Sequence, residues 1–131
     1  MTVQHVSIAI DKPPAELYAF AADPRHLPRW AKGLAEGDVT VDGPTLTVQS
    51  PMGLVRVRFA DRNALGVLDH DVTLPSGETV HNPMRVLPNG RGSEVVFSVF
   101  CRTDMDDAQF RADVAAVTRD LASLKALVEQ S

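Results

Sequence analysis

His70 and Asn82 are the residues whose types and spacing best suit chemistry on a small molecule. An imidazole can exchange a proton near neutral pH, and a carboxamide can hydrogen-bond a carbonyl or hydroxyl group. Between them, Pro75-Ser76-Gly77 predicts a three-residue hairpin loop, because proline suits the start of a type I turn and glycine the left-handed position after it. Counting outward from this loop places His70 opposite Asn82, on one face of a hairpin.

Two further turns predict the neighbours of this pair. Two-residue turns at Asn63-Ala64 and Asn89-Gly90 would join the hairpin to the strand before it and to the strand after it. The resulting register places two polar side chains in a row across the concave face of the sheet that is otherwise apolar. That row consists of Val57, His70, Asn82 and Phe97.

The two polar side chains have three possible roles. They could hydrogen-bond each other, because burying a polar group without a partner costs about 1 to 3 kcal/mol. They could orient a hydroxyl or carbonyl group of a ligand, since binding pockets are mostly apolar with a few convergent polar groups. His70 could also act as a general acid or base, although no second catalytic group has a predicted position beside it.

The same register sorts the remaining candidates by face. Phe59 and Met84 fall on the concave face and could line a pocket, although ordinary core packing also explains them. Asp71 and His81 lie opposite each other on the outer face. We therefore expect them to form an exposed cross-strand ion pair and not a catalytic dyad.

The elements that would position these residues follow from alternation and from turn residues. Val3–Ile10 alternates in polarity and predicts a first strand. Pro13-Pro14 suits the start of a helix, and Pro24–Lys32 predicts a second short helical segment. The alternating segments that follow are separated by short turns, which can join only antiparallel neighbours. We therefore expect a curved antiparallel sheet of about seven strands, with two short helices after the first strand.

A long helix is predicted at the C-terminal end. Asp106 and Gln109 have the spacing of a capping box. A helix of about 24 residues is about 36 Å long at 1.5 Å per residue, which is enough to cross the whole sheet. Its apolar residues form one stripe at intervals of four and three: Phe110, Val114, Val117, Leu121, Leu124 and Val128.

Composition limits the possible partners. The 131 residues have the length of one domain, 1–131. A net charge of -4 without a basic cluster gives no support for nucleic-acid binding. No segment approaches the roughly 18 to 20 apolar residues of a membrane span, and no signal peptide is expected. The single Cys101 excludes an internal disulfide and favours a reducing, cytoplasmic location.

Several classes of cofactor lack their sequence motifs. The four histidines show no metal-ligand spacing. The chain also has no glycine loop that could cradle a phosphate, no nucleophile elbow and no dinucleotide fingerprint. We therefore expect no metal and no other cofactor. The oligomeric state has no signature in the sequence.

The order of strand, two helices, further strands and long helix is that of the helix-grip fold. The chain resembles the START-like (SRPBCC) superfamily, in particular its small bacterial polyketide cyclase/dehydrase-like proteins. Three segments carry the resemblance: PPAELYAFAADPRHLPRWAKG, GVLDHDV with the following V-x-N-P-M-R-V hairpin, and VTRDLASLKALVE. The resemblance implies an α+β START-like domain whose sheet wraps around the C-terminal helix. It also implies that Trp30 lies near the mouth of a cavity, with packing under the short helix as the alternative to ligand contact.

This fold serves several functions, so three hypotheses remain open. The first is binding of a small hydrophobic or aromatic molecule between the sheet and the terminal helix. The second, implied by the resemblance, is a polyketide cyclase or dehydratase in which His70 moves protons and Asn82 polarises a carbonyl; it requires a cavity of about 300 Å³ or more that opens at His70. The third is a protein-interaction module, which predicts a filled interior and an exposed apolar patch.

Overall fold

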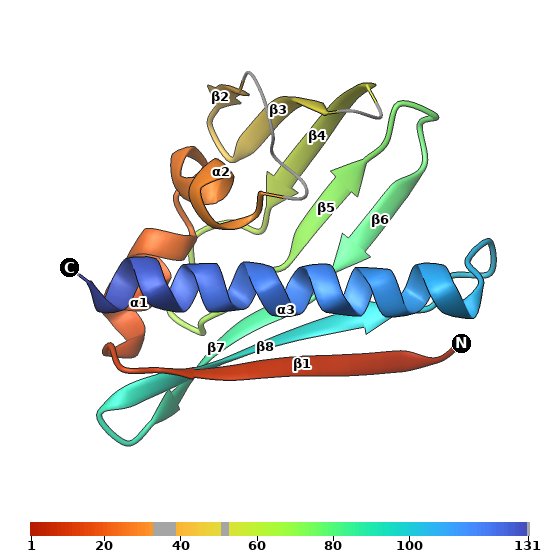
Figure 1. The fold of residues 1–131 in the computed structure, drawn as a ribbon. Helices are drawn as coiled ribbons and strands as arrows, with labels where there is room; N and C mark the ends of the chain where they lie inside the picture. Colours follow the sequence, from red (N-terminus) through yellow and green to blue (C-terminus); the bar gives the residue numbers. More distant parts are fainter. Residues whose placement is uncertain (33–38, 51–52, 131) are drawn as a thin grey trace.

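The computed structural model describes residues 1–32, 39–50 and 53–130 (Figure 1). It has the predicted α+β helix-grip fold, with two short helices after the first strand and a long helix at the C-terminal end. The elements in chain order are β1 (Val3–Ile10), α1 (Pro14–Ala21), the 3₁₀ helix η1 (Pro24–His26), α2 (Leu27–Trp30), β2 (Val39–Asp42), β3 (Thr45–Ser50), β4 (Gly53–Phe59), β5 (His70–Thr73), β6 (Thr79–Asn82), β7 (Met84–Asn89), β8 (Gly92–Phe100) and α3 (Asp107–Glu129). None of the helices in these residues is long and apolar enough to cross a membrane.

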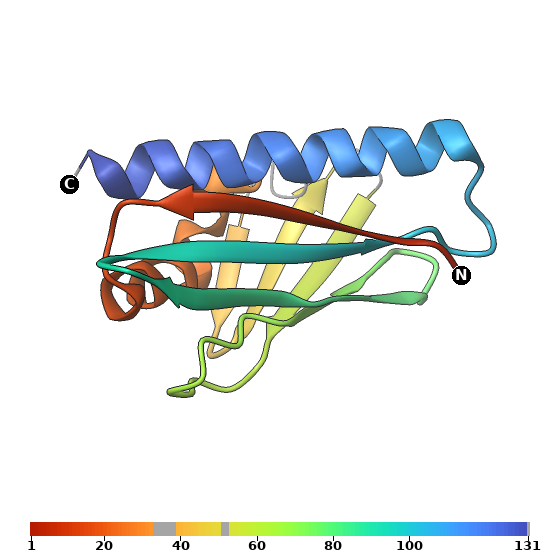
Figure 2. The same ribbon diagram turned by 90° about the horizontal axis from the view of Figure 1, so that it is seen from below.

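The strands form two antiparallel sheets. One has five strands in the order β2-β3-β4-β5-β6, and the other has three in the order β1-β8-β7. In Figure 1, β1 and β8 run along α3, whereas β3 to β6 extend away from the helix on one side. Figure 2 shows the three-stranded sheet below α3, with its strands in the direction of the helix and the other strands crossing behind it.

The described residues contain eight strands, where the sequence predicted about seven, because Pro83 divides one predicted strand. Proline has no N–H group to donate to a ladder. The segment before it, β6, pairs with β5, and the segment after it, β7, pairs with β8. The Pro83 carbonyl oxygen accepts a hydrogen bond from the N–H of Ser98 at 3.0 Å. The chain therefore passes from one sheet to the other next to Asn82.

The Pro75-Ser76-Gly77 hairpin is confirmed. His70 lies opposite Asn82. The N–H of Leu74 donates to the carbonyl oxygen of Glu78 at 2.8 Å, as the predicted pairing requires. The glycine of this loop has a φ of 92°, which is the left-handed conformation that the turn needs.

The predicted turn at Asn89-Gly90 is displaced by one residue. The loop is Gly90-Arg91, so Phe97 pairs with Met84 and not with Asn82. A type I′ turn needs positive φ at both loop positions, whereas here only the first position is positive, with a φ of 61° at the glycine. Glycine first is the arrangement of a type II′ turn. The prediction placed the glycine at the wrong position of the turn.

The predicted turn at Asn63-Ala64 is also wrong. Phe59, and not Val57, lies opposite His70. The connection between β4 and β5 is a wider loop, because the side chain of Asn63 hydrogen-bonds the backbone in four places. Its Oδ1 accepts from two N–H groups at 3.0 Å, and its Nδ2 donates to two carbonyl oxygens at 2.9 and 3.0 Å. Both register errors are shifts of two residues, so each side chain keeps its predicted face.

α3 starts at the predicted capping box. The Asp106 carboxylate accepts from the N–H of Gln109 at 2.8 Å, and the Gln109 side chain accepts from the N–H of Asp106 at 2.9 Å. The C-terminal half of the apolar stripe is buried, whereas its N-terminal half is only partly buried. α3 therefore seals the core towards its C-terminal end and leaves space beneath its middle. The buried members are Leu121, Leu124 and Val128, and the partly buried ones are Phe110, Val114 and Val117.

The two short helices close one end of this space. Prolines stand in the first turn of α1 and of α2. The Asp23 carboxylate caps η1 by accepting from the N–H of Arg25 at 3.0 Å. α2 packs against α3 and carries two buried side chains, Leu27 and Trp30. The predicted second helical segment is thus confirmed as far as Trp30.

Candidate ligand-binding cavity

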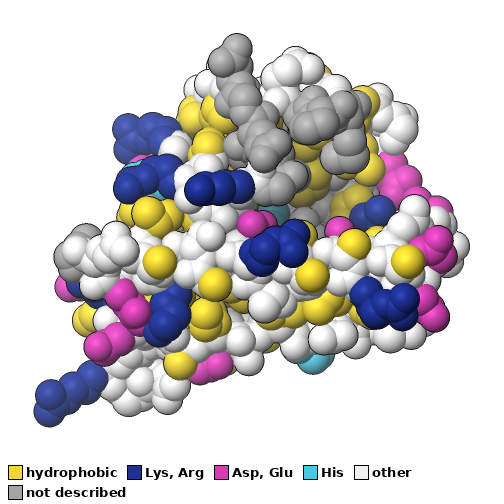
Figure 3. Space-filling view, viewed as in Figure 1, with side chains coloured by type: hydrophobic (Ala, Val, Ile, Leu, Met, Phe, Trp, Pro, Cys, Tyr) yellow, Lys and Arg dark blue, Asp and Glu magenta, His cyan; other side chains and the backbone are white. Residues whose placement is uncertain are grey.

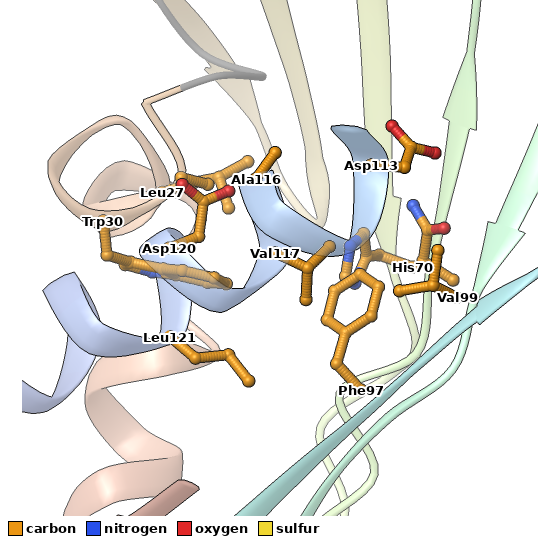
Figure 4. Close-up of a pocket in the computed structure, with 12 residues that line it drawn as sticks. Leu27, Trp30, His70, Phe97, Val99, Asp113, Ala116, Val117, Asp120 and Leu121 are labelled. Carbon is orange, nitrogen blue, oxygen red and sulfur yellow. The ribbon is translucent and has the colours of Figure 1, made fainter. Parts of the chain in front are cut away.

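A cavity of about 230 Å³ lies between α2, α3 and the strands β5, β6 and β8 (Figure 4). Its walls are mainly apolar. α2 contributes Leu27 and Trp30, β8 contributes Phe97 and Val99, and α3 contributes Leu121 among others. Figure 3 shows a hollow beside α3 at which acidic side chains and a histidine side chain are visible.

His70 is the buried polar group of this cavity, with only 3% of the residue exposed. Its ring lies between two phenylalanine rings, 5.2 Å from Phe59 and 5.6 Å from Phe97 between centroids. Its Nδ1 lies 3.0 Å from the carbonyl oxygen of Leu68. A carbonyl oxygen can only accept, so Nδ1 carries the proton and Nε2 presents a lone pair. Nε2 has no hydrogen-bond partner among the described residues.

Burial keeps His70 uncharged. Removal of water from the ring lowers its pKa below the usual 6.5. The hydrogen bond to the Leu68 carbonyl and the charges of Asp69 and Asp71 oppose this effect, but they are weaker. The site therefore offers a neutral imidazole that accepts a hydrogen bond through Nε2.

Asn82 stands opposite His70 and also lines the cavity. Its side chain is half-buried. Within the described part of the chain, no hydrogen bond joins it to His70, whose Nδ1 is bonded to Leu68. The two polar side chains therefore do not satisfy each other, and the carboxamide is available to a ligand in the cavity.

Two carboxylates of α3 complete the polar lining, and the sequence analysis missed both. Burial raises the pKa of Asp120 to about 6, and the charge of Arg119 opposes the shift. Asp113 keeps an exposed side, but loss of water at the cavity wall still raises its pKa, against the charge of Arg102. Helical spacing was the available signal, because Asp113 and Asp120 share a face with the apolar Val117.

Trp30 belongs both to the core and to the cavity wall. It is 2% exposed, so it packs under the short helix as expected, and it also lines the cavity. Its Nε1–H is buried without a hydrogen-bond partner among the described residues. An unpaired buried donor is uncommon, and here it stands at the edge of an unfilled space.

The other predicted site residues divide into two groups. Phe97 lines the cavity. Val57, Phe59 and Met84 belong to the buried core and are not among the cavity-lining residues, although Phe59 packs against the ring of His70. The two-residue register shift explains the position of Val57. It pairs with Val72 and not with the predicted His70.

The acid–histidine pair of the outer face is confirmed as exposed. His81 Nδ1 lies 2.6 Å from Asp71 Oδ1, and the two side chains are 58% and 50% exposed. Both line a second, smaller hollow of about 150 Å³, together with Asp69 and one side of His70. Among the described residues, no group of three or more histidine, cysteine or acidic side chains is arranged to hold a metal ion.

The family of the chain follows from its sequence as a whole. Residues 1–129 match the family described as polyketide cyclase / dehydrase and lipid transport. A comparison with curated proteins finds no match.

Solved structures share the fold at low sequence identity. Protein CV1439 from Chromobacterium violaceum is 15% identical with a TM-score of 0.72, and the alignment covers 98% of this chain and 99% of that one. Ara h 8.0201 is 13% identical with a TM-score of 0.69, and the alignment covers 99% of both chains. DynU16, from the dynemicin biosynthetic locus, is 13% identical with a TM-score of 0.72; the alignment covers 97% of this chain but only 47% of DynU16.

These structures show the fold alone, whereas the family match extends over nearly the whole chain. The chain therefore belongs to the polyketide cyclase/dehydrase and lipid transport family, and it has the START-like, helix-grip fold.

Proposed function

We propose that this protein binds a small hydrophobic or aromatic molecule in the cavity between the sheet and α3. The observation that carries the proposal is an unfilled, mainly apolar space lined by the buried His70, whose Nε2 has no hydrogen-bond partner among the described residues. Apolar walls with a few polar groups that fix orientation are typical of ligand pockets. The family description, which includes lipid transport, supports the same class of ligand.

The size of the cavity favours a compact ligand. A volume of about 230 Å³ corresponds to roughly eight water molecules at about 30 Å³ each. Ligand pockets usually begin at about 300 Å³, so a one-ring or two-ring molecule fits better than a long polyketide. The interaction-module hypothesis predicted a filled interior, and the cavity counts against it.

A matched pair of variants tests the proposal. Ala116 lines the cavity, whereas Ala115, the preceding residue of α3, is exposed. The fluorescence of N-phenylnaphthylamine, an uncharged apolar probe, rises on transfer from water to an apolar site. We expect Ala116→Phe to lower its affinity by about tenfold or more, which corresponds to about 1.4 kcal/mol, and Ala115→Phe to leave it unchanged. Equal binding by the wild type and Ala116→Phe would contradict a ligand in this cavity.

Native mass spectrometry of the purified protein addresses the natural ligand. A co-purified small molecule that is present in the wild type and in Ala115→Phe but absent from Ala116→Phe would be assigned to the cavity. A molecule that remains bound to all three proteins would have to bind elsewhere.

A second candidate function is a cyclase or dehydratase of polyketide-like substrates, although the cavity of about 230 Å³ is smaller than the roughly 300 Å³ expected for that function. The observation that favours it is the fixed tautomer of His70, whose Nε2 could accept a proton from a carbon next to a carbonyl group. The Asn82 carboxamide could hydrogen-bond the carbonyl oxygen as it gains negative charge. His70→Gln should then abolish turnover and retain probe binding. Turnover that survives this substitution would exclude His70 as the base.

A further inference from the structure

The ionised side chains that line the cavity are all acidic. Asp113 and Asp120 line it from α3, and among the described residues no lysine or arginine does so. Their spacing of seven residues is nearly two helical turns, which places them on one face about 10 Å apart. The charge of the lining residues is therefore negative, although Lys or Arg side chains also stand beside the hollow (Figure 3).

Asp120 lacks a counter-ion. Among the described residues, its carboxylate makes no hydrogen bond and no ion pair; Arg119 attracts it only through a longer-range charge interaction. A half-buried carboxylate without a partner is unfavourable, because it has lost part of its water and has gained nothing in return. Asp113 has the same kind of longer-range attraction, from Arg102, but it is more exposed and has lost less of its water. Asp120 is therefore the stronger site for a positive charge.

The surroundings of Asp120 also suit a cation. Trp30 lines the same cavity from α2, which packs against α3, and Figure 4 draws Asp120 and Trp30 at the same end of the cavity. An indole face attracts an ammonium group through its quadrupole, and more strongly where water is excluded. The Nε2 of His70 adds another hydrogen-bond acceptor to the cavity. The carboxylate of Asp120 and the Nε2 of His70 match a ligand that donates hydrogen bonds and carries positive charge, whereas the Nε1–H of Trp30 would need an acceptor.

We propose that the ligand of this cavity is an amphipathic amine, whose protonated amino group binds Asp120 beside Trp30 while its apolar body lies against Phe97 and Leu121. This inference rests on the proposed function and specifies its ligand class. A neutral ligand of the same shape binds less tightly, because it leaves the Asp120 carboxylate unpaired. An anionic ligand binds more weakly still, because the carboxylate repels it.

Three compounds that share an apolar body but differ in charge test whether the cavity prefers a cationic ligand. Phenylbutylamine, phenylbutanol and phenylbutyrate are cationic, neutral and anionic at neutral pH, and each can be titrated against N-phenylnaphthylamine bound to the protein. We expect the amine to bind about tenfold more tightly than the alcohol, and the carboxylate more weakly than either. Asp120→Asn should lower the affinity for the amine by about fivefold to tenfold, as for a partly buried ion pair. It should change the affinity for the alcohol by less than about twofold.

A matched control removes the same charge elsewhere. Asp61→Asn changes an exposed carboxylate of the β4–β5 loop that does not line the cavity, so the amine should bind it as it binds the wild type. Equal affinity of the wild type for amine and alcohol, or unchanged amine binding by Asp120→Asn, overturns the inference. The proposed function still stands in that case if N-phenylnaphthylamine binds and Ala116→Phe lowers its affinity. Failure of the wild type to bind N-phenylnaphthylamine overturns both.

Discussion

The Nδ1 atom of His70 donates a hydrogen bond to the backbone carbonyl oxygen of Leu68 across 3.0 Å. This bond lies within β5 and the residues just before it, so it does not depend on a ligand. It fixes which ring nitrogen carries the proton, and it directs the lone pair of Nε2 away from Leu68. The five-stranded sheet thus holds a neutral hydrogen-bond acceptor in place before any ligand binds.

The first prediction concerns the protonation of this ring. Because burial lowers the pKa of His70, we expect the ring to remain neutral at pH 6.5, where an ordinary histidine is half protonated. Nitrogen-15 NMR should show the Nδ1–H tautomer, and His70→Gln identifies the signals by removing them. A titration midpoint at or above pH 6.5 would show that the imidazole is not desolvated.

The same shift predicts a loss of stability in acid. In the unfolded chain His70 binds a proton near pH 6.5, whereas the native ring, with its lowered pKa, does not. At this residue the unfolded state therefore binds more protons below pH 6.5, so the contribution of His70 to the free energy of unfolding falls as the pH decreases through that range. Denaturant unfolding should therefore show that the stability of His70→Gln rises relative to that of the wild type as the pH decreases from 6.5 to 5. Identical slopes for the variant and the wild type would exclude this contribution.

The third prediction is that Asp120→Asn stabilises the protein without ligand. Burial raises the pKa of Asp120 from 3.8 to about 6, so the native state binds more protons than the unfolded state between these values. The contribution of Asp120 to stability is therefore greatest below pH 3.8 and is lost as the pH rises to 6. At pH 7 the substitution should raise the free energy of unfolding by an amount on the order of 1 kcal/mol, which corresponds to a Tm increase of roughly 3 to 5 °C.

Two comparisons check that the gain comes from the carboxylate of Asp120. The stabilisation should disappear at pH 4, where the wild-type side chain is mostly protonated, and it should be absent from Asp61→Asn at every pH. A gain that persists at pH 4 would point to a cause other than charge. A residue that destabilises the free protein and strengthens ligand binding is common at functional sites.

The fourth prediction compares two glycines with positive φ. Gly66 has a φ of 74°, and an added Cβ would lie 2.2 Å from the carbonyl oxygen of Val86; at Gly77, with a φ of 92°, it would meet open space. Gly77→Ala should cost about 1 kcal/mol from backbone strain alone. Gly66→Ala must also displace the backbone of β7, so we expect a cost of about 3 kcal/mol or more, measured by denaturant unfolding. Equal costs would show that the contact with Val86 is easily relieved.

Alternation was sufficient to predict which side chains face inward, because a strand has a period of two residues. The two register errors were shifts of two, so His70 and Phe97 still reached the cavity and Asp71 remained outside. Register itself depends on backbone angles at the turns. Gly90 occupies the first loop position where the second was expected, and the side-chain bonds of Asn63 replace a tight turn.

The cavity could not be predicted from the sequence in the same way. Its volume is the space that remains after α3 and the sheet have packed, and it depends on side chains from α2, β5, β8 and α3 together. Part of it was nevertheless predictable. Asp120 lies one residue before Leu121 and three after Val117, so helical periodicity alone places it at the edge of the apolar stripe.

The last prediction is that the acid–histidine pair of the outer face has no part in ligand binding. Asp71 and His81 are half exposed, although the two side chains are only 2.6 Å apart. Such pairs contribute little, because water screens the charges and two side chains must be held in place. A double-mutant cycle with Asp71→Ala and His81→Ala should give a coupling energy of about 0.2 to 1 kcal/mol that decreases with added salt. Affinity for N-phenylnaphthylamine should change by less than about twofold in either variant, whereas Ala116→Phe should lower it by about tenfold or more. If the substitutions on the outer face reduced probe binding as strongly as Ala116→Phe, the ligand would have to occupy the smaller hollow beside His81, and the cavity under α3 would lose its assignment.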